Sequence, residues 1–341
     1  MKHFILIASI ILLFSSCVST NYLIVEFKEP ARVTLPPEVV NIVVVDNSYM
    51  SDEQPSHVVL PQKDTILVSA DSARMHLGES LAKYMEEEKF FNAVTYYPNF
   101  RRGADSLQIY LTNDQIANIC DETNSDALIC INQSIIAGKM ELIPYFYDYA
   151  VLSVGVAASV KAYKADGTAF HDSYILADTL FWEGIPKEMK ISKKVAPDVP
   201  IIDIQQSMME SAEMAADVLT NLYIPFWDKE ERHYYTGGSS EMKKAAAHAN
   251  EYQWSEAATI WGTLYEQETK PVKQIRLAYN IALANECLND IDNALVWNKT
   301  AFDLLSNTNN SELRQSVTQQ GKLLRNRKNQ IQKLEQQYGS E

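Results

Sequence analysis

The stretch that decides the fold lies near the C-terminus. Residues 245–267 read AAAHANEYQWSEAATIWGTLYEQ, and residues 273–305 read KQIRLAYNIALANECLNDIDNALVWNKTAFDLL. One helical spacing, i, i+4 and i+7, recurs 37 residues later, at Ala257, Trp261 and Leu264 and again at Ala294, Asn298 and Ala301. A helix pair that buries its face only against a neighbouring pair is the unit of a helical repeat protein. The sequence therefore predicts an all-α repeat domain over residues 242–341.

This segment resembles tetratricopeptide repeats. Residues 278–282 (AYNIA) stand where that motif places the small residues of its first helix, and residues 289–294 (NDIDNA) stand at its Gly-Asp-Tyr-x-x-Ala turn. Asn289 replaces the turn glycine, and no proline closes the second unit. The resemblance implies a protein-binding module, whose expected packing residues are Trp254, Ala257, Trp261, Leu264, Ala278, Ala282, Ala294 and Ala301.

The tail after Asn307 predicts one more amphipathic helix, which caps the repeat stack. Its apolar residues Leu323, Leu324, Ile331 and Leu334 fall near helical spacing. We expect its basic residues to face solvent, namely Lys322, Arg325, Arg327 and Lys328.

The N-terminus has the pattern of a processed leader. Lys2 and His3 precede an apolar run, Phe4 to Phe14, which is too short to span a bilayer and is typical of a signal-peptide core. Ser15-Ser16-Cys17 resembles a bacterial lipobox, which implies cleavage before Cys17 and its lipidation. We expect a signal peptide at 1–16 and a lipidated N-terminus and tether at 17–35. An ordinary secretory signal followed by a chance cysteine is the alternative.

Val18 follows Cys17 where an aspartate would favour retention at the inner membrane. This favours the outer membrane. The absence of an acidic cluster after Cys17 favours its periplasmic leaflet over surface display.

Length and composition predict two globular domains. The chain has 341 residues, 46% of them apolar, and a formal net charge of −14. The negative charge, with no basic patch between aromatic residues, argues against a nucleic-acid partner.

Residues 36–225 predict a mixed β-sheet domain of the α+β or α/β class. A β-branched strand at 39–45 is followed by a helix at 72–91, a strand at 93–97, a helix opened by Thr112 and a strand at 127–136. Alternating strands at 151–163 and 168–181 around Asp166-Gly167 predict a long antiparallel hairpin, before a helix at 204–222. We expect a linker at 226–241.

The element order of this domain resembles the amino-terminal domain of TolB and related envelope lipoproteins. The whole chain, with its lipobox, Pro30–Pro36 entry, Pro225-Phe226-Trp227 and terminal repeat pair, resembles a Bacteroidetes lipoprotein family of unknown function. This resemblance implies location and domain order but no activity.

Catalytic motifs are missing from the sequence. It contains no glycine-rich nucleotide loop, nucleophile elbow or His-Glu-x-x-His. His171, Asp172 and Ser173 are neighbours in a predicted strand, so their side chains point to opposite faces. We expect no enzyme activity, cofactor or metal. Cys120 and Cys130 could bridge, or each could be a buried thiol.

Two kinds of surface site are expected. Tyr145, Phe146, Tyr147 and Tyr149 could form an aromatic platform for a glycan or peptide, or could pack under the hairpin. Asp-Ser/Thr-apolar triplets match a periplasmic O-glycosylation pattern at Thr65, Ser72, Ser106 and Thr179. The leading functional hypothesis is a non-catalytic envelope lipoprotein that binds another envelope protein through its repeats. The alternative is a ligand-binding lipoprotein that uses the 144–149 aromatics.

Overall fold

The computed structural model describes most of the chain. At 56–59 and 65–68 only the backbone is described. The described residues are 20–50, 56–59, 65–68, 70–103, 107–143, 149–187 and 200–339.

The chain divides into two compact units. The helical unit contains residues 1–30 and 226–335, and the sheet unit contains residues 31–225 and 336–341. The expected mixed-sheet domain followed by a helical domain is confirmed. The strands are β1 (Thr20–Glu29), β2 (Asn41–Asp46), β3 (Ser56–Val59), β4 (Thr65–Val68), β5 (Ala93–Pro98), β6 (Ala127–Leu142), β7 (Ala150–Lys164), β8 (Tyr174–Pro186), β9 (Ile201–Ile202) and β10 (Phe226–Tyr235). The helices are α2 (Asp71–Glu87), α3 (Asn113–Thr123), α4 (Ile204–Tyr223), α5 (Ser240–Asn250), α6 (Trp254–Gln267), α7 (Pro271–Cys287), α8 (Ile291–Leu304) and α9 (Ser311–Tyr338), with a 3-10 turn η2 (Leu305–Asn307).

The sheet unit is built around β2 and the long strand β6. β2 pairs in parallel with β5 on one side and with the first half of β6 on the other. The second half of β6 pairs with β3, and β6, β7 and β8 form an antiparallel run. The hairpin was predicted correctly: Gly167 has a φ of +85°, which the tight turn after β7 requires.

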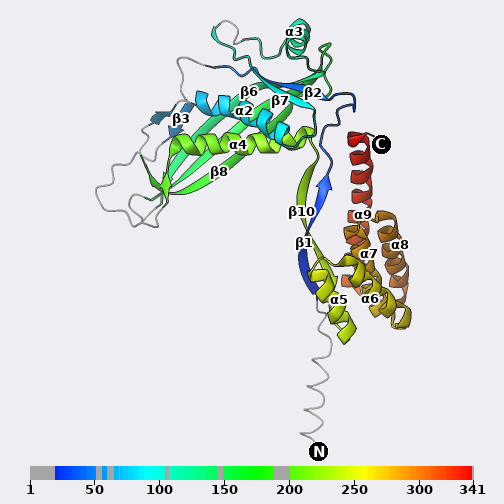
Figure 1. The fold of residues 1–341 in the computed structure, drawn as a ribbon. Helices are drawn as coiled ribbons and strands as arrows, with labels where there is room; N and C mark the ends of the chain where they lie inside the picture. The colour runs from blue at the N-terminus through cyan, green and yellow to red at the C-terminus, as the bar shows by residue number, and fades with distance from the viewer. Residues whose placement is uncertain are drawn as a thin grey trace, which may run out of the picture. The chain divides into compact units, whose positions relative to one another are not determined.

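Helices cover both faces of this sheet, as Figure 1 shows. α2 and α4 pack on one face, where Leu77 and Leu219 join the buried side chains of β2, β6 and β7. α3 covers the other face of the parallel part, where Ile116 and Cys120 meet Val43 and Val45. Strict alternation along β7 sends every second residue into the first core, which explains its regular burial pattern.

In the helical unit, α5–α6 and α7–α8 are the two predicted helix pairs, and α9 caps them. Leu313 and Val317 of α9 join a buried cluster with Ala301. The side-chain amide of Asn298 donates to the Val317 carbonyl at 2.9 Å. The cap expected from the tail sequence is therefore present.

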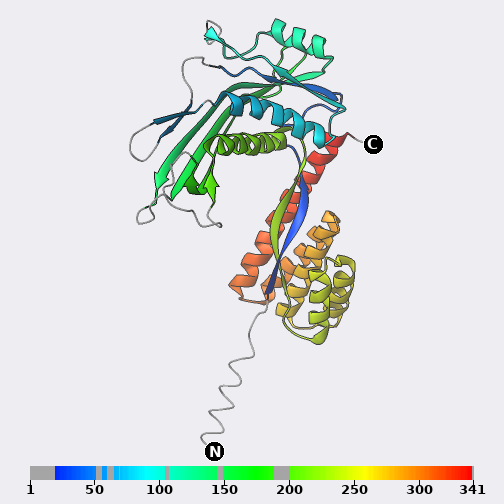
Figure 2. The same ribbon diagram turned by 60° about the vertical axis from the view of Figure 1, so that its left-hand side comes forward.

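β1 and β10 form a two-stranded antiparallel ribbon in the helical unit (Figure 2). The predicted linker at 226–241 is wrong over Phe226–Tyr235, because these residues are a paired strand. The tether expected at 17–35 likewise contains β1. The basic face expected for the tail is wrong at Arg327, which is 7% exposed.

Candidate functional site

The predicted packing residues of the repeats lie in the core of the helical unit. Ala257, Trp261, Ala278, Ala282, Ala294 and Ala301 are fully buried, and Trp254 is nearly so. Leu264 is half-buried and packs against the same cluster as Trp261.

The predicted surface sites are described only in part. Cys17, Tyr145, Phe146, Tyr147 and Ser106 lie outside the described residues, as does the side chain of Thr65. The other predicted surface residues are half-buried (Tyr149) or exposed (Ser72 at the start of α2 and Thr179 on β8). Glycosylation at the two exposed hydroxyls stays a prediction. Cys120 and Cys130 are both free, so no disulfide joins them.

The chain's own ribbon covers the face that the repeats share. Val25 and Phe27 of β1 and Tyr234 of β10 are buried with residues of α5 and α7. Asn280 of α7 pairs with the backbone of Tyr235, accepting from its N–H at 2.9 Å and donating to its C=O at 2.7 Å. An array of repeats can offer a surface to a partner; here the ribbon covers the part of it that α5, α6 and α7 form.

Buried charged side chains bind this ribbon to α7 and α9. The Arg232 guanidinium donates to the Glu286 carboxylate of α7 at 2.8 Å, and both side chains are almost fully buried. Arg327 of α9 donates to the Lys28 carbonyl at 2.7 Å. The guanidinium carbons of Arg232 and Arg327 lie 5.1 and 4.9 Å from the Phe27 ring centroid. Such contacts make the ribbon an integral part of the helical unit.

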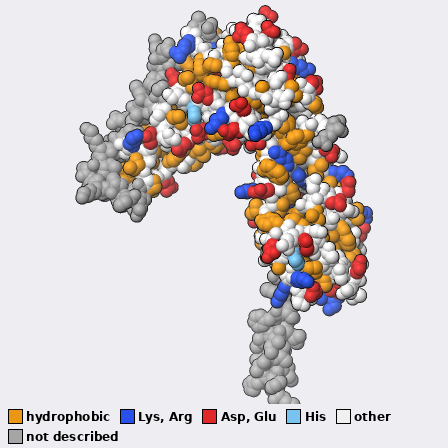
Figure 3. All heavy atoms as spheres, in the orientation of Figure 1, with side chains coloured by type: hydrophobic (Ala, Val, Ile, Leu, Met, Phe, Trp, Pro, Cys, Tyr) orange, Lys and Arg blue, Asp and Glu red, His pale blue; other side chains and the backbone are white. Residues whose placement is uncertain are grey.

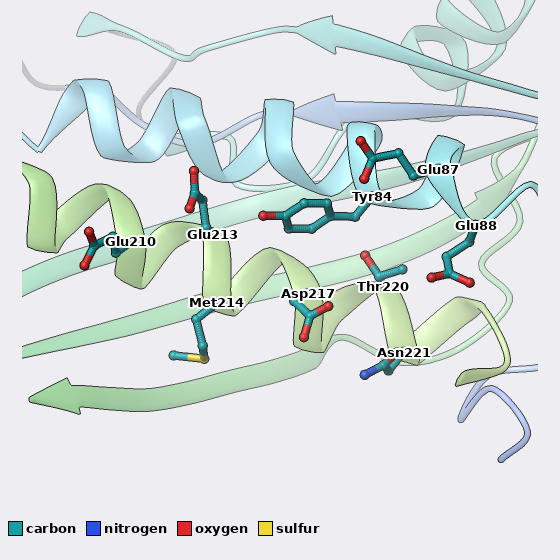
Figure 4. Close-up of a pocket in the computed structure, with 9 residues that line it drawn as sticks. All are labelled: Tyr84, Glu87, Glu88, Glu210, Glu213, Met214, Asp217, Thr220 and Asn221. Carbon is teal, nitrogen blue, oxygen red and sulfur yellow. The ribbon is translucent and has the colours of Figure 1, made fainter. Parts of the chain in front are cut away.

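A groove in the sheet unit runs between α2 and α4 and has a volume of about 500 Å³. Figure 4 shows Tyr84 between the two helices, with carboxylates projecting from both. Acidic side chains also lie along this side of the unit in Figure 3. The residues that line the groove are Tyr84, Glu87, Glu88, Glu210, Glu213, Met214, Asp217, Thr220 and Asn221.

Two of these carboxylates are held in place. The Oε1 atom of Glu213 lies 2.6 Å from the Nε2 atom of His76 of α2. The Glu210 carboxylate accepts a 3.0 Å hydrogen bond from the indole N–H of Trp182. Burial raises the pKa of Tyr84, and the negative potential of Glu213 raises it further. The groove therefore offers partly fixed carboxylates, with no Lys or Arg among its described lining residues. Lys83 stands at its edge, 6.0 Å from the centroid of the Tyr84 ring and 3.8 Å from Glu87, and offsets part of the negative charge on the α2 side.

A buried polar cluster lies at the C-terminal end of β2. The Oδ1 atom of the fully buried Asp46 accepts from the backbone N–H of Ser48 at 3.0 Å and from its hydroxyl at 2.5 Å. The Ser134 hydroxyl of β6 donates to Ser48 at 3.0 Å. Burial raises the pKa of Asp46 to about 6, although the bonds from Ser48 oppose the shift.

Several polar atoms of this region lack partners among the described residues. They include Asp46 Oδ2, the Tyr96 hydroxyl and both amide atoms of Asn132, which occupies the irregularity in β6 between Ile131 and Gln133. Gly78 of α2 closes the cluster, since a Cβ there would lie 2.9 Å from Asp46 Oδ2. β2 is flanked by β5 and β6, so the cluster stands at the strand ends where α/β sheets bind ligands. An Asp after an apolar run predicts only the end of a strand, and no other sequence feature points to this cluster or to the groove.

No group of three or more His, Cys, Asp and Glu residues in the described ranges is placed to hold a metal ion. No helix within the described part of the chain is long and apolar enough to cross a membrane.

Two solved structures show limited likeness to the chain. A neuraminyllactose-binding hemagglutinin homolog from Helicobacter pylori is 10% identical over 56% of this chain and 86% of its own, with a TM-score of 0.27. The hypothetical protein CT253 from Chlamydia trachomatis is 6% identical over 53% of this chain and 97% of its own, with a TM-score of 0.23. These scores are too low to carry an argument. No curated protein matches the chain.

Family models match both parts of the sequence. Residues 243–326 match the domain of unknown function DUF6340. Residues 39–235, more than half of the chain, match the domain of unknown function DUF8603. The chain belongs to the DUF8603 family.

Proposed function

We propose that this chain is a non-catalytic, lipid-anchored protein of the cell envelope that binds a basic segment of another envelope protein. The lipobox-like Ser15-Ser16-Cys17 supports the anchor. Val18 in place of an aspartate supports the outer membrane, and the lack of an acidic cluster after Cys17 supports its periplasmic leaflet. The observation that carries the binding role is the groove between α2 and α4. Its lining combines several carboxylates with the aromatic ring of Tyr84, a combination suited to lysine and arginine side chains.

The repeats have a supporting role in this proposal. Their shared face already holds the β1–β10 ribbon, through the contacts of Phe27, Tyr234 and Asn280. This favours the sheet unit as the partner-binding part and gives the helical unit, which contains the N-terminal strand β1, a supporting role.

Charge reversal in the groove tests the proposal. The full-length protein and the variant Glu213→Lys/Asp217→Lys are cross-linked in intact cells, extracted in mild detergent and purified. The matched control is Asp121→Lys, which reverses an exposed charge on α3. We expect a specific partner with the wild type and the control and its loss with the groove variant. A partner retained by the groove variant would refute the assignment of the groove.

A second candidate function is the binding of a small polar ligand. It is favoured by the unpartnered atoms of Asp46, Tyr96 and Asn132 at the end of β2. The aromatics at 144–149 remain the other place proposed for such a ligand. Native mass spectrometry of the protein purified from its own envelope should then show a bound small molecule that is lost in Asp46→Asn. Tyr145→Ala/Tyr147→Ala tests the aromatic surface in the same way.

A further inference from the structure

Three large side chains are exposed together where the ribbon meets the first helix pair. Tyr22 and Ile24 of β1 are 65% and 46% exposed, and Tyr252, in the turn between α5 and α6, is 59% exposed. The Tyr252 hydroxyl donates to the Ile24 carbonyl at 3.2 Å, which joins the turn to the strand. We call Tyr22, Ile24 and Tyr252 the ribbon-end patch.

Tyr252 adopts a backbone conformation that costs free energy. Its φ is +58°, in the left-handed region that bulky residues rarely enter. The equivalent position of the second helix pair is Asn289, with a φ of +59°, and asparagine tolerates this region well. Within the helical unit the Tyr252 side chain has the bond to Ile24 and an edge-to-face contact with Trp254, at 6.3 Å between ring centroids. The rest of its ring is exposed and open to a contact outside this unit.

The length of chain before β1 limits what this contact can be. Cys17 and Tyr22 are five residues apart, so their Cα atoms lie within roughly 18 Å of each other. A lipid-bearing Cys17 stands at the bilayer surface, whose headgroup layer is about 5–8 Å deep. The chain between Cys17 and Tyr22 is therefore short enough for the anchor to hold the ribbon-end patch within reach of the bilayer.

We propose that the ribbon-end patch rests in the headgroup layer of the membrane to which Cys17 is attached. Tyrosine rings have the apolar body and polar tip that favour this layer. Tyr22, Ile24 and Tyr252 would orient the helical unit on the membrane, beyond the simple tethering that acyl chains provide. The inference rests on the lipid anchor of the proposed function.

The test is a depth measurement on the lipidated full chain in vesicles of phosphatidylethanolamine and phosphatidylglycerol. A nitrobenzoxadiazole probe is attached at Tyr22→Cys or Ile24→Cys in a Cys287→Ala background; Cys120 and Cys130 are buried and unreactive. The control is Trp227→Cys. Trp227 pairs with Lys28 on the same face of the ribbon, is also exposed, and lies about 20 Å along the strand from Tyr22.

We expect a quencher carried on the lipid to lower the emission of probes at 22 and 24 roughly twofold, and to leave the probe at 227 nearly unchanged. Absent quenching at 22 and 24, or equal quenching at all three positions, would overturn the inference. A blue shift of the probe emission that depends on protein concentration and not on vesicles would also overturn the inference, because it would indicate contact between two copies of the protein. Mass spectrometry of the N-terminal peptide shows whether Cys17 is acylated. An acylated Cys17 with an unquenched probe refutes the membrane contact of the ribbon-end patch and leaves the lipid anchor standing. An unacylated Cys17 refutes both.

Discussion

Replacing Asp46 by Asn should make the sheet unit more stable at neutral pH. Asp46 is fully buried, and its Oδ2 atom has no partner among the described residues. Burial raises its folded-state pKa from the ordinary 3.8 of an aspartate to about 6. Asparagine keeps the Oδ1 acceptor that Ser48 uses and removes the charge, so the desolvation cost disappears.

The size and the pH dependence of this effect follow from the pKa shift. A raised carboxyl pKa means that the folded state binds the proton more tightly than the unfolded state. The group therefore stabilises the fold fully below about pH 4, and this stabilisation is lost as pH rises to about 6. A shift of about two pKa units corresponds to about 3 kcal/mol as an upper bound. At pH 7.5 Asp46→Asn should raise the free energy of unfolding by most of this roughly 3 kcal/mol, and near pH 4 it should change the free energy of unfolding very little.

Urea titration at a series of pH values measures the difference. Unfolding of the sheet unit is followed separately from the helical unit through the thiols of Cys120 and Cys130, which are buried and belong to this unit, in a Cys287→Ala background. Asp121→Asn, a change at an exposed residue of α3, is the control and should shift stability by less than about 0.5 kcal/mol. A variant less stable than wild type at pH 7.5, or one with the same pH dependence, would refute the view that this carboxylate is uncompensated.

Three other substitutions test the packing. Glu286→Gln removes the more buried of the two carboxylates that Arg232 contacts and leaves it Glu230, 2.6 Å away; the helical unit should lose about 1–3 kcal/mol in urea titration, and a loss below about 0.5 kcal/mol would contradict a buried pair. Gly78→Ala places a methyl group 2.8 Å from the Tyr96 ring and should lower sheet-unit stability by about 1–3 kcal/mol, whereas an unchanged midpoint would show that the cluster relaxes freely. Thr112→Ala removes the capping box at the start of α3 and should cost about 1 kcal/mol by the same assay, with Thr112→Ser close to wild type.

Local sequence patterns predicted those elements whose partners are near in the chain. The alternation of residues 150–164 and the Asp166-Gly167 turn were sufficient for the β7–β8 hairpin, because both strands and their turn are contiguous. Thr112 and Gln115 likewise identified the start of α3, where both halves of the capping box form. The recurring alanines of α6–α8 identified the helix pairs.

Features that depend on distant partners were missed. β10 has the sequence FWDKEERHYY, in which five consecutive charged residues interrupt any strand pattern. It is a strand because it pairs with β1, some 200 residues earlier in the chain. Arg327 looked like part of a solvated basic face, because its partners Lys28 and Glu29 are equally remote. Asp46 and Ser134 join one hydrogen-bond network through Ser48 only when β2 and β6 pair in parallel. Neither the buried cluster nor the groove between α2 and α4 has a local sequence signature.

We propose that the groove between α2 and α4 receives the partner. A photoreactive benzoyl-phenylalanine in place of Met214, which lines the groove and is half-buried, tests this in living cells. The same residue in place of Val296, exposed on α8 of the repeats, is the comparison. The account predicts a discrete cross-linked adduct from position 214, abolished by Glu213→Lys/Asp217→Lys, and none from position 296. An adduct from position 296 with none from 214 would contradict the account and return the partner to the repeats.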